Sequence, residues 1–188
     1  GVQYKPEEIV VSNGGKHALF NALYVLTNPG DSVAVITPDW VSYLSQIAIC
    51  GCQAVKIPTL FEEDFYPSPQ TIREHLTPET KVLIINSPNN PTGAVYSKEL
   101  LEEIARIAIE KDLWVISDEV YANLVYDGEH TSISTFPGMR ERTVVINAFS
   151  KSHAMTGWRC GYSAAPVAVT KEIGKLQSHM TSNINAPT

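Results

Sequence analysis

The chain has 188 residues, of which 44% are hydrophobic and 18% charged, and its formal net charge at pH 7 is -6. That length favours one domain with a well-buried core, and no apolar run approaches the roughly 18 residues that a membrane span needs. The 14 Lys and Arg residues are scattered without a basic run, which argues against nucleic acid as a partner because binding to a phosphate backbone needs a basic face.

Short apolar runs recur along the chain and predict buried strands at residues 32–37, 53–58, 81–86, 113–117 and 143–147. Helical patterns lie between them at residues 16–26, 41–49 and 97–109. This alternation is typical of crossover units in a parallel sheet, so the predicted class is α/β. Two stretches that contain Pro or Gly, 64–78 and 127–142, interrupt the alternation and are predicted to be surface connections.

The third helical pattern shows most clearly how a helix is encoded. Ser97 is a predicted N-cap, and Glu99 lies near the positive end of the helix dipole. Leu101, Ile104 and Ala108 belong to one apolar stripe. We expect this stripe to cover a face of the sheet.

The cysteines and histidines show no metal or disulfide pattern. Cys50, Cys52 and Cys160 form neither an even disulfide set nor a CxxC pair, and the five histidines are dispersed. We therefore expect no metal site, and we expect the cysteines to be small buried side chains in a protein of the reducing cytoplasm. The chain opens at Gly1 without a charged and apolar leader, so the sequence predicts no secretory signal.

In open α/β sheets, ligands bind outside the carboxyl ends of the strands, so the residues that follow each strand are the first place to search for chemistry. The run SNGGK at residues 12–16 places two glycines before a predicted helix, whose unpaired N–H groups can hold an anion. It is not a P-loop, because that pattern needs Gly at Val10 and Ser or Thr at His17. A phosphate cradle and a plain tight turn are both compatible with this run.

Two further runs follow predicted strands. NSPNNPTG at residues 86–93 is a stiff turn that holds Asn90 in a fixed direction, where its amide can donate to a ligand oxygen; a purely structural turn is the alternative. SDEVY at residues 117–121 puts Asp118 directly after an apolar strand. Because a buried carboxylate is costly unless it is paired, Asp118 suggests a cationic partner, with the capping of a neighbouring loop as the alternative.

The run AFSKSHAMTGWR at residues 148–159 brings Lys151 to the same edge of the sheet. A lysine near cations or in an apolar pocket can add to a carbonyl carbon, whereas a single lysine without such surroundings is a solvated surface charge. A serine acyl-enzyme site is excluded, because the Ser-x-x-Lys pattern needs Ser at Ala148.

Taken in this order, SNGGK, NPTG, SDEVY and SK followed eight residues later by Arg159 resemble the class I and II aminotransferases of pyridoxal 5'-phosphate (PLP) fold type I, over essentially the whole chain. The combination is specific although each run alone is not. The resemblance implies a mostly parallel central sheet with helices on both faces and assigns residues 1–188 to the PLP-binding large domain. It also implies that relatives begin before Gly1 and continue past Thr188 into a smaller domain that supplies the arginine for the substrate carboxylate, so that this chain alone would be a poor transaminase.

The resemblance implies a role for each matching residue. Lys151 would form the Schiff base with PLP and then move a proton between the substrate α-carbon and the cofactor. Asp118 would pair with the pyridine nitrogen, so that the ring is an electron sink. Asn90 and Tyr121 would hydrogen-bond the phenolic oxygen, and Trp40 would stack on the ring.

The remaining matches would hold the phosphate of PLP. They are Gly15, Lys16 through its backbone, Ser150, and Arg159, whose planar guanidinium suits a dianion. Many relatives carry Ser or Gly at the position of Ala148, so this chain lacks one hydroxyl for the phosphate.

The leading hypothesis is an aminotransferase acting on an α-amino acid and an α-keto acid. The run PDWVSY at residues 38–43 resembles the aspartate-using branch, and the resemblance implies a homodimer in the full-length protein. A PLP-dependent carbon-sulfur β-lyase would share every cofactor contact. A PLP-binding transcriptional regulator would carry a DNA-binding domain upstream of Gly1. A degenerate fold without cofactor is disfavoured because Lys151, Asp118 and Arg159 are all present.

Overall fold

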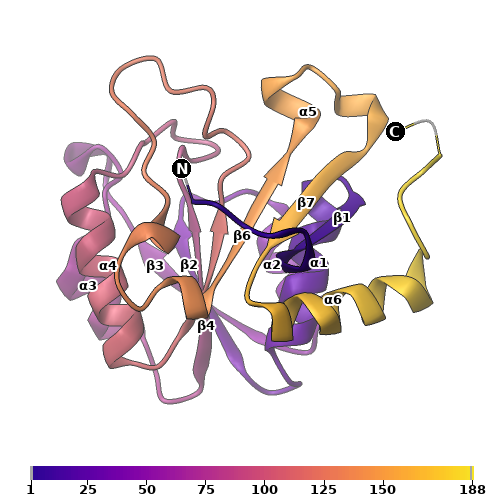
Figure 1. The fold of residues 1–188 in the computed structure, drawn as a ribbon. Coiled ribbons are helices and arrows are strands. Elements are labelled where there is room, and N and C mark those ends of the chain that lie inside the picture. The colour runs from indigo at the N-terminus through magenta and orange to yellow at the C-terminus, as the bar shows by residue number, and fades with distance from the viewer. Residues whose placement is uncertain (1, 187) are drawn as a thin grey trace.

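The computed structural model describes residues 2–186 and 188. Within these residues, seven strands form one sheet in the order β1-β7-β6-β5-β4-β2-β3 (Figure 1). Among these strands the neighbours are parallel, except that β7 runs antiparallel to both β6 and β1. The strands are β1 (Ile9–Asn13), β2 (Ser32–Thr37), β3 (Gln53–Pro58), β4 (Thr80–Asn86), β5 (Trp114–Asp118), β6 (Thr143–Ala148) and β7 (Cys160–Ala164).

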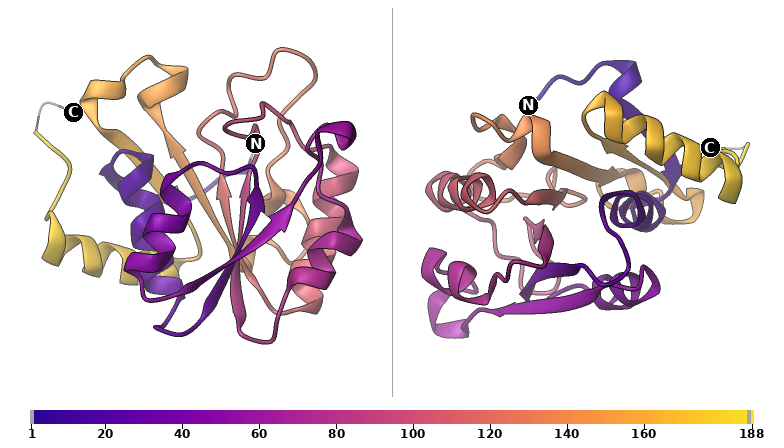
Figure 2. Two further views of the ribbon diagram at one scale, coloured as in Figure 1. Left: turned by 180° about the vertical axis from the view of Figure 1, so that it is seen from behind. Right: turned by 90° about the horizontal axis from the view of Figure 1, so that it is seen from below.

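Helices cover both faces of the sheet, as Figure 2 shows in the view from below. α1 (Gly15–Leu26), α2 (Ser42–Ile49) and α6 (Val167–Met180) pack on one face. α3 (Pro69–His75) and α4 (Lys98–Glu110) pack on the other, and the short α5 (Phe149–Ser152) follows β6 directly. The predicted α/β class, with a mostly parallel sheet between two helical layers, is confirmed. Short 3-10 turns are η1 (Pro6–Glu8), η2 (Phe61–Glu63), η3 (Ile133–Thr135), η4 (Arg140–Arg142) and η5 (Thr156–Trp158).

The strand β2, which lies between β4 and β3, shows how the sequence produces this layering. Val33 and Val35 belong to the core beneath α1 and α6, whereas Ala34 and Ile36 belong to the core beneath α4. Side chains of a strand alternate between its two faces, so a strand buried on both faces must be apolar throughout. This requirement explains why the parallel strands read as continuous apolar runs.

The helix α4 confirms the predicted cap and stripe. The hydroxyl of Ser97 accepts a hydrogen bond from the backbone N–H of Leu100 at 3.2 Å. Leu101, Ile104 and Ala108 are buried against the sheet. The cap fixes where the helix starts, and the stripe fixes which side of it faces inward.

The prediction that two stretches are mere surface connections is wrong. Residues 64–78 contain α3, whose Ile72 is fully buried. Residues 127–142 carry Ile133 and Met139, both fully buried in the same core. Pro and Gly mark the turns in these stretches correctly, but apolar side chains between the turns complete the core that α4 begins.

The three cysteines are free and buried, as predicted. Among residues 2–186 and 188, no helix combines the length and apolarity required to cross a bilayer. The same residues hold no group of three or more His, Cys, Asp and Glu side chains arranged for a metal ion.

Candidate active site

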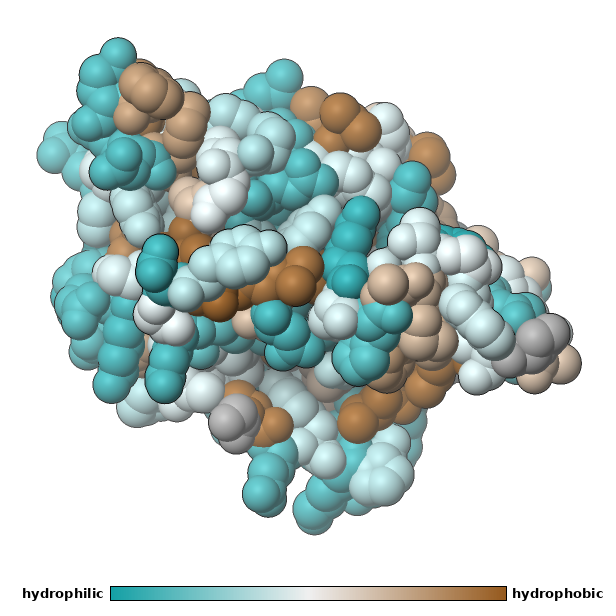
Figure 3. Space-filling view, turned by 90° about the horizontal axis from the view of Figure 1, so that it is seen from above, coloured by the Kyte–Doolittle hydropathy of each residue, from teal (hydrophilic) through white to brown (hydrophobic). Residues whose placement is uncertain are grey.

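A pocket of about 250 Å³ lies where the parallel strands β4, β5 and β6 end, beside the first turn of α1. Figure 3 shows the surface at this end of the molecule, where hydrophilic residues predominate. All nine residues that the sequence singled out line this pocket: Gly15, Lys16, Trp40, Asn90, Asp118, Tyr121, Ser150, Lys151 and Arg159. Because parallel strands end at one edge of a sheet, runs far apart in the sequence meet here.

The pocket also has lining residues to which sequence analysis gave no role. Asn86, Val120 and Thr156 line it, together with the methyl group of Ala148. Each lies inside one of the runs at residues 86–93, 117–121 and 148–159, so the signal for them was position within a recognised run.

One end of the pocket is built to hold an anion. Gly15 and Lys16 occupy the first two positions of α1, where backbone N–H groups have no acceptor within the helix, and no side chain of the described residues caps this N-terminus. Gly14 precedes them with a φ of 83°, and a Cβ on it would lie 2.5 Å from Nη2 of Arg159. A glycine is therefore required for the guanidinium to approach the helix N-terminus, and the two together form a cationic cradle.

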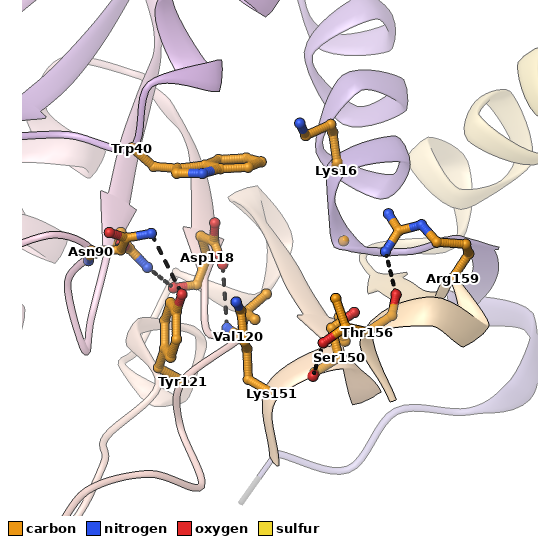
Figure 4. A pocket seen from close by; sticks show the side chains of 13 residues that line it. Lys16, Trp40, Asn90, Asp118, Val120, Tyr121, Ser150, Lys151, Thr156 and Arg159 are labelled. Atoms are coloured by element: carbon orange, nitrogen blue, oxygen red, sulfur yellow. Dashed lines mark hydrogen bonds between the residues drawn. The ribbon is translucent and has the colours of Figure 1, made fainter. Parts of the chain in front are cut away.

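Arg159 is held in place by its own segment. Its Nη1 donates to the carbonyl oxygen of Thr156 at 3.0 Å, and the Thr156 hydroxyl donates to the carbonyl oxygen of Ser150 at 3.0 Å (Figure 4). The backbone of Arg159 is left-handed, with a φ of 54°, a conformation that costs a non-glycine residue about 1 kcal/mol. The strain and the carbonyl contacts aim the guanidinium at the α1 N-terminus.

The opposite side of the pocket carries Asp118 at the end of β5. Asp118 is 7% exposed, and its carboxylate accepts a hydrogen bond from the Tyr43 hydroxyl at 2.6 Å and another from the Val120 N–H at 3.2 Å. Burial and, to a smaller extent, the adjacent Glu119 raise the pKa of the Asp118 carboxyl to about 6, although the two hydrogen bonds oppose the shift. The predicted depth of Asp118 is confirmed.

An amide and a phenol stand side by side near Asp118. The Asn90 side chain donates to the Tyr121 hydroxyl at 3.4 Å. Asn86 orders this corner, because its side-chain oxygen accepts from the Asn90 N–H at 2.8 Å and its amide donates to the Asp118 carbonyl at 2.9 Å. The turn after β4 and the end of β5 are thereby locked to each other.

Trp40 and Lys151 complete the pocket. Figure 4 shows the Trp40 indole lying across it, with the Lys151 amine directed into it from α5 on the other side. The Lys151 Nζ is 5.8 Å from the centre of the Tyr121 ring, and the Lys16 Nζ is 5.0 Å from that of Trp40. Neither lysine has an ion-pair partner among residues 2–186 and 188. The Lys151 amine thus shares one pocket with the flat indole of Trp40, the buried Asp118 carboxylate and the anion cradle.

Comparison with known proteins identifies relatives of this chain. The family model for aminotransferase class I and II matches residues 1–188. The aspartate/prephenate aminotransferase of Thermus thermophilus is 46% identical over 97% of this chain and 47% of its own length. The aspartate aminotransferase of Thermotoga maritima is 47% identical over 98% of this chain and 50% of its own length.

Solved structures of aminotransferases share the fold of this chain. The aspartate aminotransferase from Thermus thermophilus with maleate superposes with a TM-score of 0.93 at 46% identity, over 96% of this chain and 47% of that one. The aromatic aminotransferase from Pyrococcus horikoshii superposes with a TM-score of 0.95 at 41% identity, over 98% of this chain and 50% of that one. The chain thus spans about half the length of the relatives it matches. It belongs to the class I and II aminotransferase family.

Proposed function

We propose that this chain binds PLP and forms the cofactor-binding large domain of an aminotransferase. The observation that carries the proposal is the position of the Lys151 amine, which points into a pocket with an anion cradle at one end and a buried carboxylate at the other. A phosphorylated pyridine aldehyde has a dianion, a carbonyl carbon and a basic ring nitrogen, and each has a matching group here.

The residues present fit that cofactor in charge and shape. Gly14 leaves a space that any Cβ would fill, so the Arg159 guanidinium and the N-terminus of α1 converge on one anion. Asp118 offers a carboxylate to a cationic ring nitrogen, and Asn90 with Tyr121 offers an N–H and an O–H to a phenolic oxygen. Ala148 adds only a methyl group at the anion end, so backbone N–H groups and Arg159 supply most of the hold there.

When bound, PLP supplies an electron sink for the pair left on the substrate α-carbon. Lys151 provides the amine that attaches the cofactor and that can hold or return a proton at its Nζ. A charged Asp118 favours the protonated ring nitrogen, which strengthens the sink as charge develops. Trp40, which lies across the pocket, would cover one face of the cofactor ring and exclude water from it.

We further propose an acidic substrate of the aspartate type. The Lys16 ammonium lies over the Trp40 ring at the wall of the pocket and has no acidic partner among residues 2–186 and 188, so it can bind a second carboxylate. The names of the relatives, aspartate and aspartate/prephenate aminotransferase, support the same class. An amino-group acceptor would be an α-keto acid.

We also propose an oligomeric state and a cellular location. Exposed apolar side chains on and beside α1 and α2, namely Tyr24, Val41 and Ile49, support a homodimer. Three free, buried cysteines support a reducing, cytoplasmic location. Analytical ultracentrifugation of the purified protein tests the first point, because a monomer at all concentrations would contradict it.

Reductive labelling tests the cofactor assignment. Protein incubated with PLP and reduced with borohydride should carry a pyridoxyl group on Lys151, and the Lys151→Ala variant should not. Lys16→Ala serves as the matched control, since it removes the other pocket amine and should leave the label in place. Labelling of Lys16 instead, or none on folded protein, would contradict the proposal.

Product analysis tests the reaction. In the full-length protein, aspartate with 2-oxoglutarate should give a new amino acid and a new keto acid in equal amounts. Ammonia and pyruvate from a cysteine conjugate, without amino-group transfer, would favour a carbon-sulfur β-lyase instead.

A further inference from the structure

Tyr43 contacts two residues of the pocket without lining the pocket itself. It lies in the first turn of α2 and is 1% exposed. Its hydroxyl donates to Oδ2 of Asp118 at 2.6 Å. Its ring meets the Trp40 ring edge-on, with ring centres 5.5 Å apart and an interplanar angle of 84°. One side chain therefore braces both the aromatic surface and the buried acid.

The hydrogen bond between Tyr43 and Asp118 has a fixed direction. Burial and the neighbouring carboxylate raise the pKa of the Tyr43 phenol well above its ordinary value of 10, so the phenol keeps its proton. Because the Tyr43 hydroxyl always donates, Oδ2 of Asp118 must accept. Oδ1 of Asp118 accepts from the Val120 N–H. Each carboxylate oxygen thus has one donor, which sets the plane of the group and leaves its remaining lone pairs for a ligand.

We propose that Tyr43 is a positioning residue that holds Asp118 as an oriented carboxylate facing the pocket. Its consequence for catalysis rests on the proposed function, whereas the effect on Asp118 itself does not. A hydrogen bond to the charged form favours that form, so Tyr43 opposes the tendency of burial to protonate Asp118.

Other ionisable groups near Asp118 also change the pKa values of Asp118 and Tyr43. Glu119, the next residue, raises the pKa of Asp118. Asp39 and Tyr121 raise that of Tyr43 and so strengthen its role as donor. Lys151 is the cation that faces the pocket from α5. Of the described groups in contact with the Asp118 carboxylate, the Tyr43 hydroxyl is the one that a single conservative substitution removes.

The test compares Tyr43→Phe with Tyr96→Phe. Tyr43→Phe removes only the hydroxyl and keeps the ring against Trp40. Tyr96 is 3% exposed in the core on the other face of the sheet, so Tyr96→Phe controls for loss of a buried phenol. The readout is the titration midpoint of the Asp118 carboxyl carbon, followed by NMR in protein without PLP.

The expected result is an upward shift of the Asp118 midpoint by about one pH unit or more in Tyr43→Phe, because the removed bond favoured the charged form. Tyr96→Phe should leave the midpoint unchanged. With PLP bound, the acid limb of the kcat profile should move upward in Tyr43→Phe while KM stays near that of the parent. An unchanged Asp118 midpoint in folded Tyr43→Phe overturns the proposal.

A second measurement applies if Tyr43→Phe does not fold. In the unsubstituted protein, a short O–H donor to Asp118 should produce a deuterium isotope shift on its carboxyl carbon between H2O and D2O above the titration midpoint. Absence of that shift overturns the proposal. Failure of PLP to bind would reject the proposed function and leave both titration results unaffected.

Discussion

Replacing Gly161 with alanine is expected to destabilise the protein and to disrupt the anion cradle. Gly161 lies in β7, where a Cβ would be 2.5 Å from the Gly15 nitrogen, 2.6 Å from the Gly14 carbonyl carbon and 3.0 Å from the Asn147 oxygen. All three are backbone atoms, so no side-chain rotation can relieve the overlap. β7 approaches the first turn of α1 this closely only because both sides are glycine.

The magnitude follows from these distances. An ordinary contact between heavy atoms is about 3.5 Å, so β7 and the start of α1 must separate by about 1 Å. Overpacking of this kind costs roughly 1–3 kcal/mol, and a clash with backbone on both sides belongs at the upper end. A loss of about 3 kcal/mol lowers the folding equilibrium constant by about two orders of magnitude. Displacing the Gly15 N–H by about 1 Å should weaken phosphate binding at least tenfold, since charge-assisted hydrogen bonds depend on short distances.

Urea unfolding and PLP affinity measure the two effects. Gly161→Ala should lower the unfolding midpoint without changing the slope, which would indicate an altered stability and not an altered unfolded state. Gly174→Ala in α6 is the matched control, because its Cβ would lie 4.0 Å from Val10 in ordinary contact. It should be neutral or stabilise the protein by up to about 1 kcal/mol through helix propensity. If Gly161→Ala had the stability and PLP affinity of the parent, the close approach of β7 to α1 would be wrong.

Further predictions concern Asp118, Arg159 and Lys16. Asp118→Asn should keep PLP bound but slow exchange of the substrate α-proton with solvent by orders of magnitude, as followed by NMR; parental exchange would exclude Asp118 as the ring-nitrogen partner. Arg159→Lys should weaken PLP binding about tenfold or more in equilibrium dialysis, because a point charge replaces a planar fork; an unchanged Kd would contradict the cradle. Lys16→Met should raise KM for aspartate far more than KM for a monocarboxylic amino acid, and equal increases would remove Lys16 from substrate recognition. Without PLP, the difference in free energy of unfolding between Asp118→Asn and the parent should change by about 3 kcal/mol in favour of the variant as pH rises from about 4 to 7.

The pocket was predictable because each of its parts has a local signal. A glycine pair before a helix, a Pro-rich turn after a strand, and an acid or a lysine after an apolar run are each read within a few residues. Parallel strands then bring their carboxyl ends together without further information. For this reason Asn90, Asp118 and Lys151, from three different connections, lie around one cavity.

The parts that were not predicted depend on contacts between distant segments. Tyr43 donates to Asp118 across 75 positions, and on its own it reads as an ordinary core aromatic of α2. Gly161 matters only because α1 passes beside it, which no local pattern records. β7 escaped notice because its sequence, CGYSA, includes Gly and Ser in place of an apolar run. Its antiparallel direction, with β1 beyond it, follows from tertiary packing.

The pH prediction for Asp118 shows how the site and the stability of the fold oppose each other. The pKa of the carboxyl is raised from its ordinary 3.8 to about 6, because burial outweighs the opposing hydrogen bonds from the Tyr43 hydroxyl and the Val120 N–H. Since the folded pKa lies above that of the unfolded chain, the folded protein binds more protons between about pH 4 and 6, and this group therefore lowers the free energy of unfolding as pH rises through that window.

The rise in the pKa of Asp118 from 3.8 to about 6 corresponds to about 3 kcal/mol. Ionised Asp118 lowers the free energy of unfolding by this amount at neutral pH when no cofactor is bound. Asparagine carries no such charge, so the comparison with Asp118→Asn isolates this contribution from those of Glu8 and Glu79, whose lowered pKa values act in the opposite sense. A cationic ring nitrogen beside Asp118 would return its pKa toward the ordinary range and remove most of the difference. If the gap between variant and parent stayed constant from pH 4 to 7 without PLP, Asp118 would not be the strained acid that this pocket is built around.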